Sequence, residues 1–174
     1  FYIRGWFDLY CTQGPTSTSE FERLAAKLGH FKVVETGWPK LDAFFDGEGR
    51  LIELHGPRPT VLYTSTFTKW ITSTPYLYDE IERLAGEKDW DWMITFHPKM
   101  DLEIKERYMA LAERCPNVTF HDGDNNIELM ERADVMLCDS SSIIVEYLYL
   151  DKPVVTYKNT SPGPWLIDID DPSK

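Results

Sequence analysis

The sequence predicts an α/β fold in which a doubly wound, mostly parallel sheet is covered by helices on both faces. Short runs rich in β-branched and aromatic residues alternate with amphipathic helical patterns, which is the order of βα units. The runs in the second half of the chain are almost continuously apolar, as expected for strands buried on both faces. In such a sheet, ligands bind at the carboxyl ends of the strands.

The length, charge and amino-acid composition of the chain exclude several classes of protein. The 174 residues suit one domain, or one domain and part of another. The 18 Lys and Arg against 29 Asp and Glu give a net charge of −11, which argues against nucleic acid as a partner. The longest apolar runs, such as Ile143 to Val145, are far shorter than the ~20 residues of a membrane span. The three cysteines are far apart, so we expect reduced, buried thiols, a cytoplasmic location and no disulfide framework or metal site.

Residues 1–36 are expected to be the end of an amino-terminal Rossmann-like domain. The chain has no initiator methionine or signal peptide at Phe1, so we expect it to be part of a longer protein. Its expected elements are a strand at 9–12, a helix that a capping box at Ser17–Glu20 opens and Gly29 closes, and a strand at 31–36.

The stretch from residue 37 to 59 is rich in Gly and Pro and is expected to be a linker with a short helix at 41–45. Residues 60–174 are expected to form a second, self-contained α/β domain. Its strands are expected at 61–66, 92–97, 118–121, 135–139 and 154–157. Its helices are expected after Thr74 and Pro75, near 102–112, near 127–132 and at 142–150.

The strongest candidate for a ligand site is the turn formed by Ser140, Ser141 and Ser142, between a strand and a helix. Its hydroxyls, the first N–H groups of the helix and the helix dipole together favour a phosphate. Serines are also common helix caps, so a purely structural role is equally open. Glu146 follows one turn later and would accept hydrogen bonds from ribose hydroxyls, unless it is a solvated helix charge.

Three other strand ends carry polar residues. His97, before Pro98, would donate to a phosphate or act as an acid, or would be satisfied within its turn. The run from Thr64 to Lys69, which includes Ser65 and Thr66, combines hydroxyls with one cation, although threonine is also common at strand ends. The segment from His121 to Asp124 suits contact with a base or metal, and equally a plain turn. The G-x-S-x-G elbow, the P-loop and the G-x-G-x-x-G fingerprint are all absent.

Several of these segments resemble one family in order and spacing. Asp139-Ser140-Ser141-Ser142-Ile143 with Glu146, and then Leu150 to Tyr157, resembles the D-Y-S-S-x-x-x-[DE] segment and K-P-hydrophobic-Y strand of the CDP-glycerol glycerophosphotransferases. These are teichoic-acid-type polymerases with a GT-B-like fold. Phe96-His97-Pro98 resembles the family's H-P motif, residues 36–42 its T-G-x-P-R-x-D linker, and residues 61–66 its I-L-Y-A-P-T strand.

The similarity extends from about Asp8 to Tyr157, with a few departures from the family pattern. Ser140 replaces the Tyr of D-Y-S-S, Lys40 replaces the linker Arg, and Thr68, beside Lys69, replaces an Arg. The H-G-T motif of the amino-terminal half has no counterpart.

The resemblance implies transfer of glycerol phosphate from CDP-glycerol to an acceptor hydroxyl, with release of CMP, in cell-envelope or capsular polymer synthesis. This chain would be the donor-binding part, with the nucleotide donor in the domain of residues 60–174, a polymer or lipid-linked acceptor, no cofactor and no metal. The catalytic base is expected in the amino-terminal half, so the isolated chain should be inactive. The protein would be cytoplasmic or peripheral to the inner face of the membrane. The resemblance makes His97 catalytic and assigns donor contacts to Thr66, Lys69, Asp139, Ser141, Ser142 and Glu146.

Two other interpretations remain open. A GT-B sugar transferase or a UDP-sugar 2-epimerase would use the same crevice and a similar serine-helix-glutamate unit. A preference for cytidine nucleotides would indicate a glycerophosphotransferase, and a preference for uridine nucleotides would indicate a sugar transferase or epimerase. The third possibility is a nucleotide-binding module without catalytic activity, which would turn over no nucleotide-linked donor.

Overall fold

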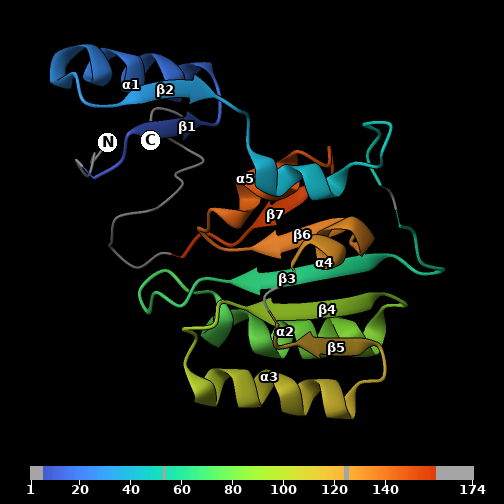
Figure 1. Cartoon of the computed structure of the whole chain (residues 1–174). Helices are drawn as coiled ribbons and strands as arrows, with labels where there is room; N and C mark the ends of the chain where they lie inside the picture. The colour runs from blue at the N-terminus through green and yellow to red at the C-terminus, as the bar shows by residue number, and fades with distance from the viewer. Residues whose placement is uncertain (1–5, 53, 124–125, 160–174) are drawn as a thin grey trace. The chain divides into compact units, whose positions relative to one another are not determined.

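The computed structural model describes residues 6–52, 54–123 and 126–159 (Figure 1). The chain divides into two compact units, Phe1–Glu48 and Gly49–Lys174. Among the described residues, no helix combines the length and the apolar character that a bilayer crossing requires. The break between the units lies inside the stretch expected to be a linker, and the assignment of residues 1–36 to a separate amino-terminal domain stays a prediction.

The first unit is a small βαβ arrangement. Strands β1 (Leu9–Thr12) and β2 (Lys32–Glu35) pair in parallel, and helix α1 (Pro15–Leu28) connects them. A 3₁₀ helix, η1 (Pro39–Phe44), follows. Gly29 ends α1 in the left-handed conformation, with φ of 73°, as its sequence position predicts.

The expected capping box at Ser17 is wrong, because α1 begins two residues earlier with Pro15 in its first turn. The Ser17 hydroxyl lies inside that turn and donates to the Gly14 carbonyl at 2.9 Å. The fixed φ of proline suits the first helical position, which explains why the Gly14-Pro15 pair starts the helix.

The second unit contains the five-stranded parallel sheet that the sequence predicts. Its strand order is β5-β4-β3-β6-β7. The chain therefore builds outward from β3 to β5, returns to the other side of β3, and continues outward through β6 and β7. The strands are β3 (Thr60–Ser65), β4 (Asp91–Phe96), β5 (Val118–His121), β6 (Val135–Cys138) and β7 (Val154–Thr156).

The helices follow from the same connectivity. Right-handed crossovers put α2 and α3 on one face, and they put α4 and α5 on the other, because the sheet then grows in the opposite direction (Figure 1). Thr74 is the first residue of α2 rather than its cap, and Ser73 precedes it. The helices are α2 (Thr74–Glu87), α3 (Leu102–Arg114), α4 (Asn126–Arg132) and α5 (Ile143–Leu148).

Large side chains fill the core between the sheet and the α2–α3 layer. Tyr63, Phe96 and Tyr108 meet there with ring centroids 4.9–5.8 Å apart. Tilted and edge-to-face contacts of this kind add to the free energy of burial and fix how α3 packs on β3 and β4. Other fully buried members of this cluster are Ile81, Ile94 and Leu111.

Lys152, the lysine of the K-P segment, has a structural role. Its ammonium donates to the carbonyls of Met130, Glu131 and Ala133, at and just beyond the last turn of α4. These carbonyls have no partner within the helix, and a cation is favoured at that end of the helix dipole. The lysine that precedes β7 therefore caps a helix on a different segment.

Candidate functional site

The carboxyl ends of β4, β3 and β6 lie side by side at one edge of the sheet. Ser65 pairs with Phe96, and Thr64 pairs with Cys138. The chain reverses its direction of growth between β3 and β6, and a crevice at such a switch point is where open α/β sheets bind ligands. His97, Thr66 and Asp139 follow these three strands directly, so the fold brings together residues that are far apart in the sequence.

Asp139 is the centre of this edge and is completely buried. One carboxylate oxygen accepts a hydrogen bond from the Thr66 amide at 2.9 Å. The other accepts from the Ser73 amide and the Ser73 hydroxyl, both at 2.8 Å, and from the Ser65 hydroxyl. The carboxylate thus ties the end of β6 to the end of β3 and to the start of α2.

The hydroxyls around Asp139 have partners of their own. Tyr63 Oη lies 2.9 Å from the Ser73 oxygen, and the Thr72 hydroxyl lies 2.8 Å from that of Ser65. Burial raises the pKa of Tyr63 well above its ordinary value, so the phenol stays protonated and can donate. Every donor around Asp139 is then used within the protein, and this network fixes the loop between β3 and α2.

His97 lies at the exposed end of β4. Its Nδ1 accepts a hydrogen bond from the Lys99 amide at 3.0 Å, so the neutral ring carries its proton on Nε2. The ring packs against that of Phe67, with centroids 4.5 Å apart. The sequence left open whether His97 is satisfied within its turn or donates to a ligand. In the structure Nδ1 is satisfied within the turn, and Nε2 is a donor available to a ligand.

The serine turn connects β6 to α5. Ser140 is buried, Ser141 is half-buried and Ser142 is exposed. The Ser142 side chain makes no capping hydrogen bond to α5, so the simple cap interpretation does not apply to it. Helix α5 has only six residues, and the hydroxyls of Ser141 and Ser142 are therefore the stronger argument for an anion site than its dipole.

The other candidate residues differ in their exposure. Thr66 and Glu146 are buried, at 7% and 8% exposure, Glu146 on the inner face of α5. Lys69 is exposed and lines a groove on the α2 side of the β3 loop. The edge thus divides into a buried framework and an exposed set of polar groups.

His121 ends β5, two strands from the switch point. Its Nε2 is buried without a hydrogen-bond partner in the described part of the chain. Burial, and secondly the charge of Arg132, lower the pKa of His121, which favours the neutral ring. Asp124, the end of the segment considered for a base or metal, lies outside the described residues.

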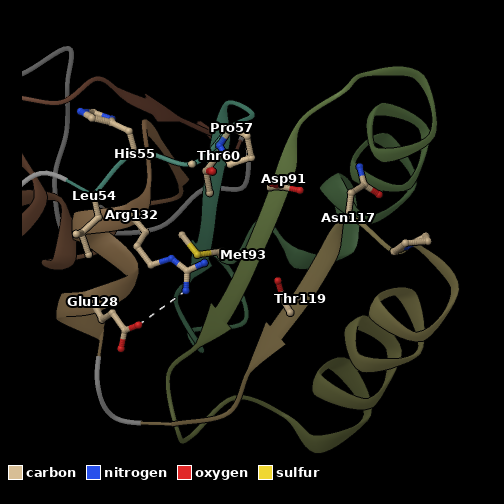
Figure 2. Close-up of a pocket in the computed structure, with 12 residues that line it drawn as sticks. Leu54, His55, Pro57, Thr60, Asp91, Met93, Asn117, Thr119, Glu128 and Arg132 are labelled. Carbon is tan, nitrogen blue, oxygen red and sulfur yellow. Dashed lines mark ion pairs between the residues drawn. The ribbon is translucent and has the colours of Figure 1, made fainter.

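A second groove, of about 470 Å³, opens at the opposite edge of the sheet (Figure 2). Thr60 and Asp91, at the starts of β3 and β4, line it, and Arg132 forms an ion pair with Glu128 at 3.8 Å on its α4 side. This is the edge where the strands begin, and parallel sheets of this kind bind their ligands at the other edge. We therefore place the candidate site at the ends of β3, β4 and β6.

Sequence reasoning included Ser65 only as one member of the hydroxyl run before Lys69, and it missed Ser73 and Lys99. The run of hydroxyls before Pro75 was a signal for a capped helix start, but it gave no indication that Asp139 is the acceptor. Lys99 lies two residues after His97, and its backbone amide sets the tautomer of that histidine.

Comparisons with solved structures show the fold. The S. aureus MnaA protein, in a co-structure with UDP, is 17% identical with a TM-score of 0.55; the match covers 84% of this chain and 42% of that one. A glycosyltransferase from Rickettsia africae is 14% identical with a TM-score of 0.50, covering 85% of this chain and 50% of that one. A protein from Listeria monocytogenes described as a UDP-N-acetylglucosamine 2-epimerase is 12% identical with a TM-score of 0.50, covering 73% of this chain and 32% of that one. The α/β fold is therefore that of GT-B glycosyltransferases and epimerases, and this chain spans half or less of the length of these proteins.

The sequence itself gives the family. No curated protein matched it. The family model described as CDP-Glycerol:Poly(glycerophosphate) glycerophosphotransferase matches residues 7–161, which is most of the chain and includes the serine turn, His97 and Lys152. The chain belongs to the CDP-glycerol:poly(glycerophosphate) glycerophosphotransferase family.

Proposed function

We propose that this chain binds CDP-glycerol at the ends of β3, β4 and β6 and is the donor-binding part of a glycerophosphotransferase of the cell envelope. The observation that carries the proposal is the exposed set of donors beside the switch point. His97 Nε2 and the hydroxyls of Ser141 and Ser142 are available to a ligand, while the carboxylate between them is used entirely within the protein. Strands lie about 4.8 Å apart, so the ends of β4 and β6 are about 10 Å apart and flank a diphosphate-sized ligand.

The transfer step would form one P–O bond and break another. The acceptor hydroxyl oxygen attacks the phosphorus of the glycerol phosphate group, and its proton passes to a base. The P–O bond to CMP breaks, and CMP leaves with the bonding electron pair. His97 and the serine hydroxyls would donate to the diphosphate oxygens where this negative charge develops, which is where fixed donors stabilise a transition state most.

Two of the buried residues of the edge would act indirectly. We propose that Asp139 and Thr66 position the β3–α2 loop, in place of the direct donor contacts that the resemblance implies for them. Glu146 would accept the ribose hydroxyls from its place on α5, next to the serine turn.

The test is a calorimetric titration of the chain with CDP-glycerol, CDP and UDP. Removing one charge-assisted hydrogen bond costs about 1–3 kcal/mol, so His97→Ala and Ser142→Ala should each weaken CDP binding by about 5- to 150-fold. His55→Ala and Ser19→Ala are matched controls, because both residues are exposed and lie outside the proposed site. Equal affinities for wild type and all four variants would exclude this site.

The same titrations separate the rival functions. Stronger binding of UDP than of CDP would favour a sugar transferase or 2-epimerase, the activities named for the structural neighbours. CMP release from CDP-glycerol, measured with and without a poly(glycerophosphate) acceptor, should show no acceptor-dependent turnover by this chain. The physical reason is that the attacking hydroxyl and its base must be held within about 3–3.5 Å of reacting distance, and the base is proposed to lie in another part of the protein.

A further inference from the structure

A groove of about 520 Å³ lies beside the proposed donor site, between the β3–α2 loop and the start of α3. Phe67, Met100 and Ile104 supply apolar surface, and Lys69, Lys99 and Arg107 bring three cations to it. The volume is within the range of ligand pockets in proteins, about 300–1,000 Å³. Three cations at one groove are notable in a chain whose net charge is −11.

These cations are held largely without carboxylate partners. Within the described residues, neither Lys69 nor Lys99 forms an ion pair. The Lys99 ammonium lies 5.7 Å from the centre of the Phe67 ring, a cation–π contact that uses none of its hydrogen-bond donors. The Arg107 guanidinium lies 3.7 Å from the centre of the Tyr78 ring and also contacts the exposed Asp79 at 3.3 Å. The groove therefore has positive charge available to an anion.

Two acidic residues limit that charge. Asp101 and Glu103 also line the groove, and Asp101 accepts a hydrogen bond from the Glu103 amide at 3.1 Å as the cap of α3. Among the residues that line the groove, three cations and two carboxylates leave a formal charge of +1, and Asp79, the partner of Arg107 outside the lining, offsets part of it. A single phosphodiester carries one negative charge, so it fits this balance better than a diphosphate does.

The groove is also coupled to His97. The Phe67 ring packs on the His97 ring at 4.5 Å, and the Lys99 amide donates to His97 Nδ1. A ligand in the groove would thus lie on one side of His97, and the proposed donor on the other. An acceptor must approach the donor in this way for transfer to occur.

We propose that this groove binds a phosphodiester of the poly(glycerophosphate) acceptor, with Lys69, Lys99 and Arg107 as its partners. This inference rests on the proposed function. Cations on long, exposed side chains suit a polymer with one charge per repeat that must move after each addition. They would bind it weakly and in a salt-dependent manner.

The experiment titrates the chain with a short glycerol-phosphate oligomer, and separately with CMP, following backbone amides by NMR. The oligomer should shift the amides of residues 67–69 and 99–107, and CMP those of residues 140–143. Reversing a charge at an exposed site costs about 1 kcal/mol or more, so Lys69→Glu and Lys99→Glu should each weaken oligomer binding by about fivefold or more. Lys88→Glu makes the same change at an exposed position outside the groove and should leave binding unchanged.

The outcomes separate this inference from the proposed function. Loss of CMP binding in His97→Ala, with oligomer binding unchanged by Lys69→Glu and Lys99→Glu, would overturn the groove and leave the donor site. Oligomer binding that depends on the lysines, in a chain that binds no CMP, would support the groove and overturn the donor site. Competition of CMP with the oligomer for the lysine-lined groove, or no oligomer binding at all, would also overturn the acceptor assignment.

Discussion

Replacing Asp139 by Asn tests whether this carboxylate holds the site together. Asn keeps the size of the side chain, but one oxygen becomes an NH₂ group that cannot accept a hydrogen bond. Whichever way the amide turns, at least one of the backbone amides of Thr66 and Ser73 then faces a donor. Losing a buried hydrogen bond to a charged acceptor costs about 1.5–3 kcal/mol, and Asp139→Ala, which removes the acceptor from both backbone amides at once, should cost about 3–5 kcal/mol.

Thermal and urea unfolding measure this cost. At roughly 3–4 °C per kcal/mol for a chain of this size, Asp139→Asn should lower the Tm by about 5–12 °C. Asp134→Asn is the matched control: Asp134 accepts the Thr60 amide at 2.8 Å and is partly exposed, so one amide oxygen suffices there. If Asp139→Asn melted within 2 °C of Asp134→Asn, or bound CDP as wild type does, the framework role would be wrong.

Three further predictions concern single side chains. Lys152→Met keeps the aliphatic stem but leaves the α4 carbonyls without their donor, and should lower the urea midpoint by the equivalent of about 1.5–3 kcal/mol. Burial raises the pKa of the Cys138 thiol to about 12, so at pH 8 a thiol reagent should label the exposed Cys11 quickly and Cys138 only after unfolding; equal rates would contradict the packing. The pKa of His121 is lower in the folded protein than in the unfolded chain, so the unfolded chain is protonated first as the pH falls. Stability should therefore fall as the pH drops below about 6.5, and less so in His121→Gln, when urea midpoints are compared at pH 7.5 and 5.5.

The sequence was sufficient to predict the sheet because its signals are local. Within the described residues, apolar runs and the turn residues around them place the five strands of this sheet, and the two strands of the first unit, within about one residue of their observed bounds. The start of α1 was wrong because two local signals compete there: a proline suited to the first turn and a serine suited to the cap. The Ser17 hydroxyl forms hydrogen bonds with the Gly14 backbone from inside the first turn. The spacing of residues alone cannot distinguish such a serine from one that caps the helix.

The site was harder to predict, because its framework joins distant segments. Asp139 meets Ser65 and Ser73, which lie 74 and 66 positions away, and only the strand order brings them together. Lys152 was recognised as part of a K-P segment, but its role as a cap of α4 depends on tertiary structure. His97 was the easiest to find, since a polar residue directly after a buried strand must lie at the ligand edge of a parallel sheet.

The most direct test of the central claim is a crystal structure of this chain with CDP-glycerol. The proposal predicts the diphosphate at the ends of β3, β4 and β6, with its oxygens within hydrogen-bond distance of His97 Nε2 and the Ser142 hydroxyl. It also predicts that the Asp139 carboxylate keeps its four protein donors and does not touch the ligand. A nucleotide bound instead in the groove between Asp91 and Arg132, at the opposite edge of the sheet, would contradict the account.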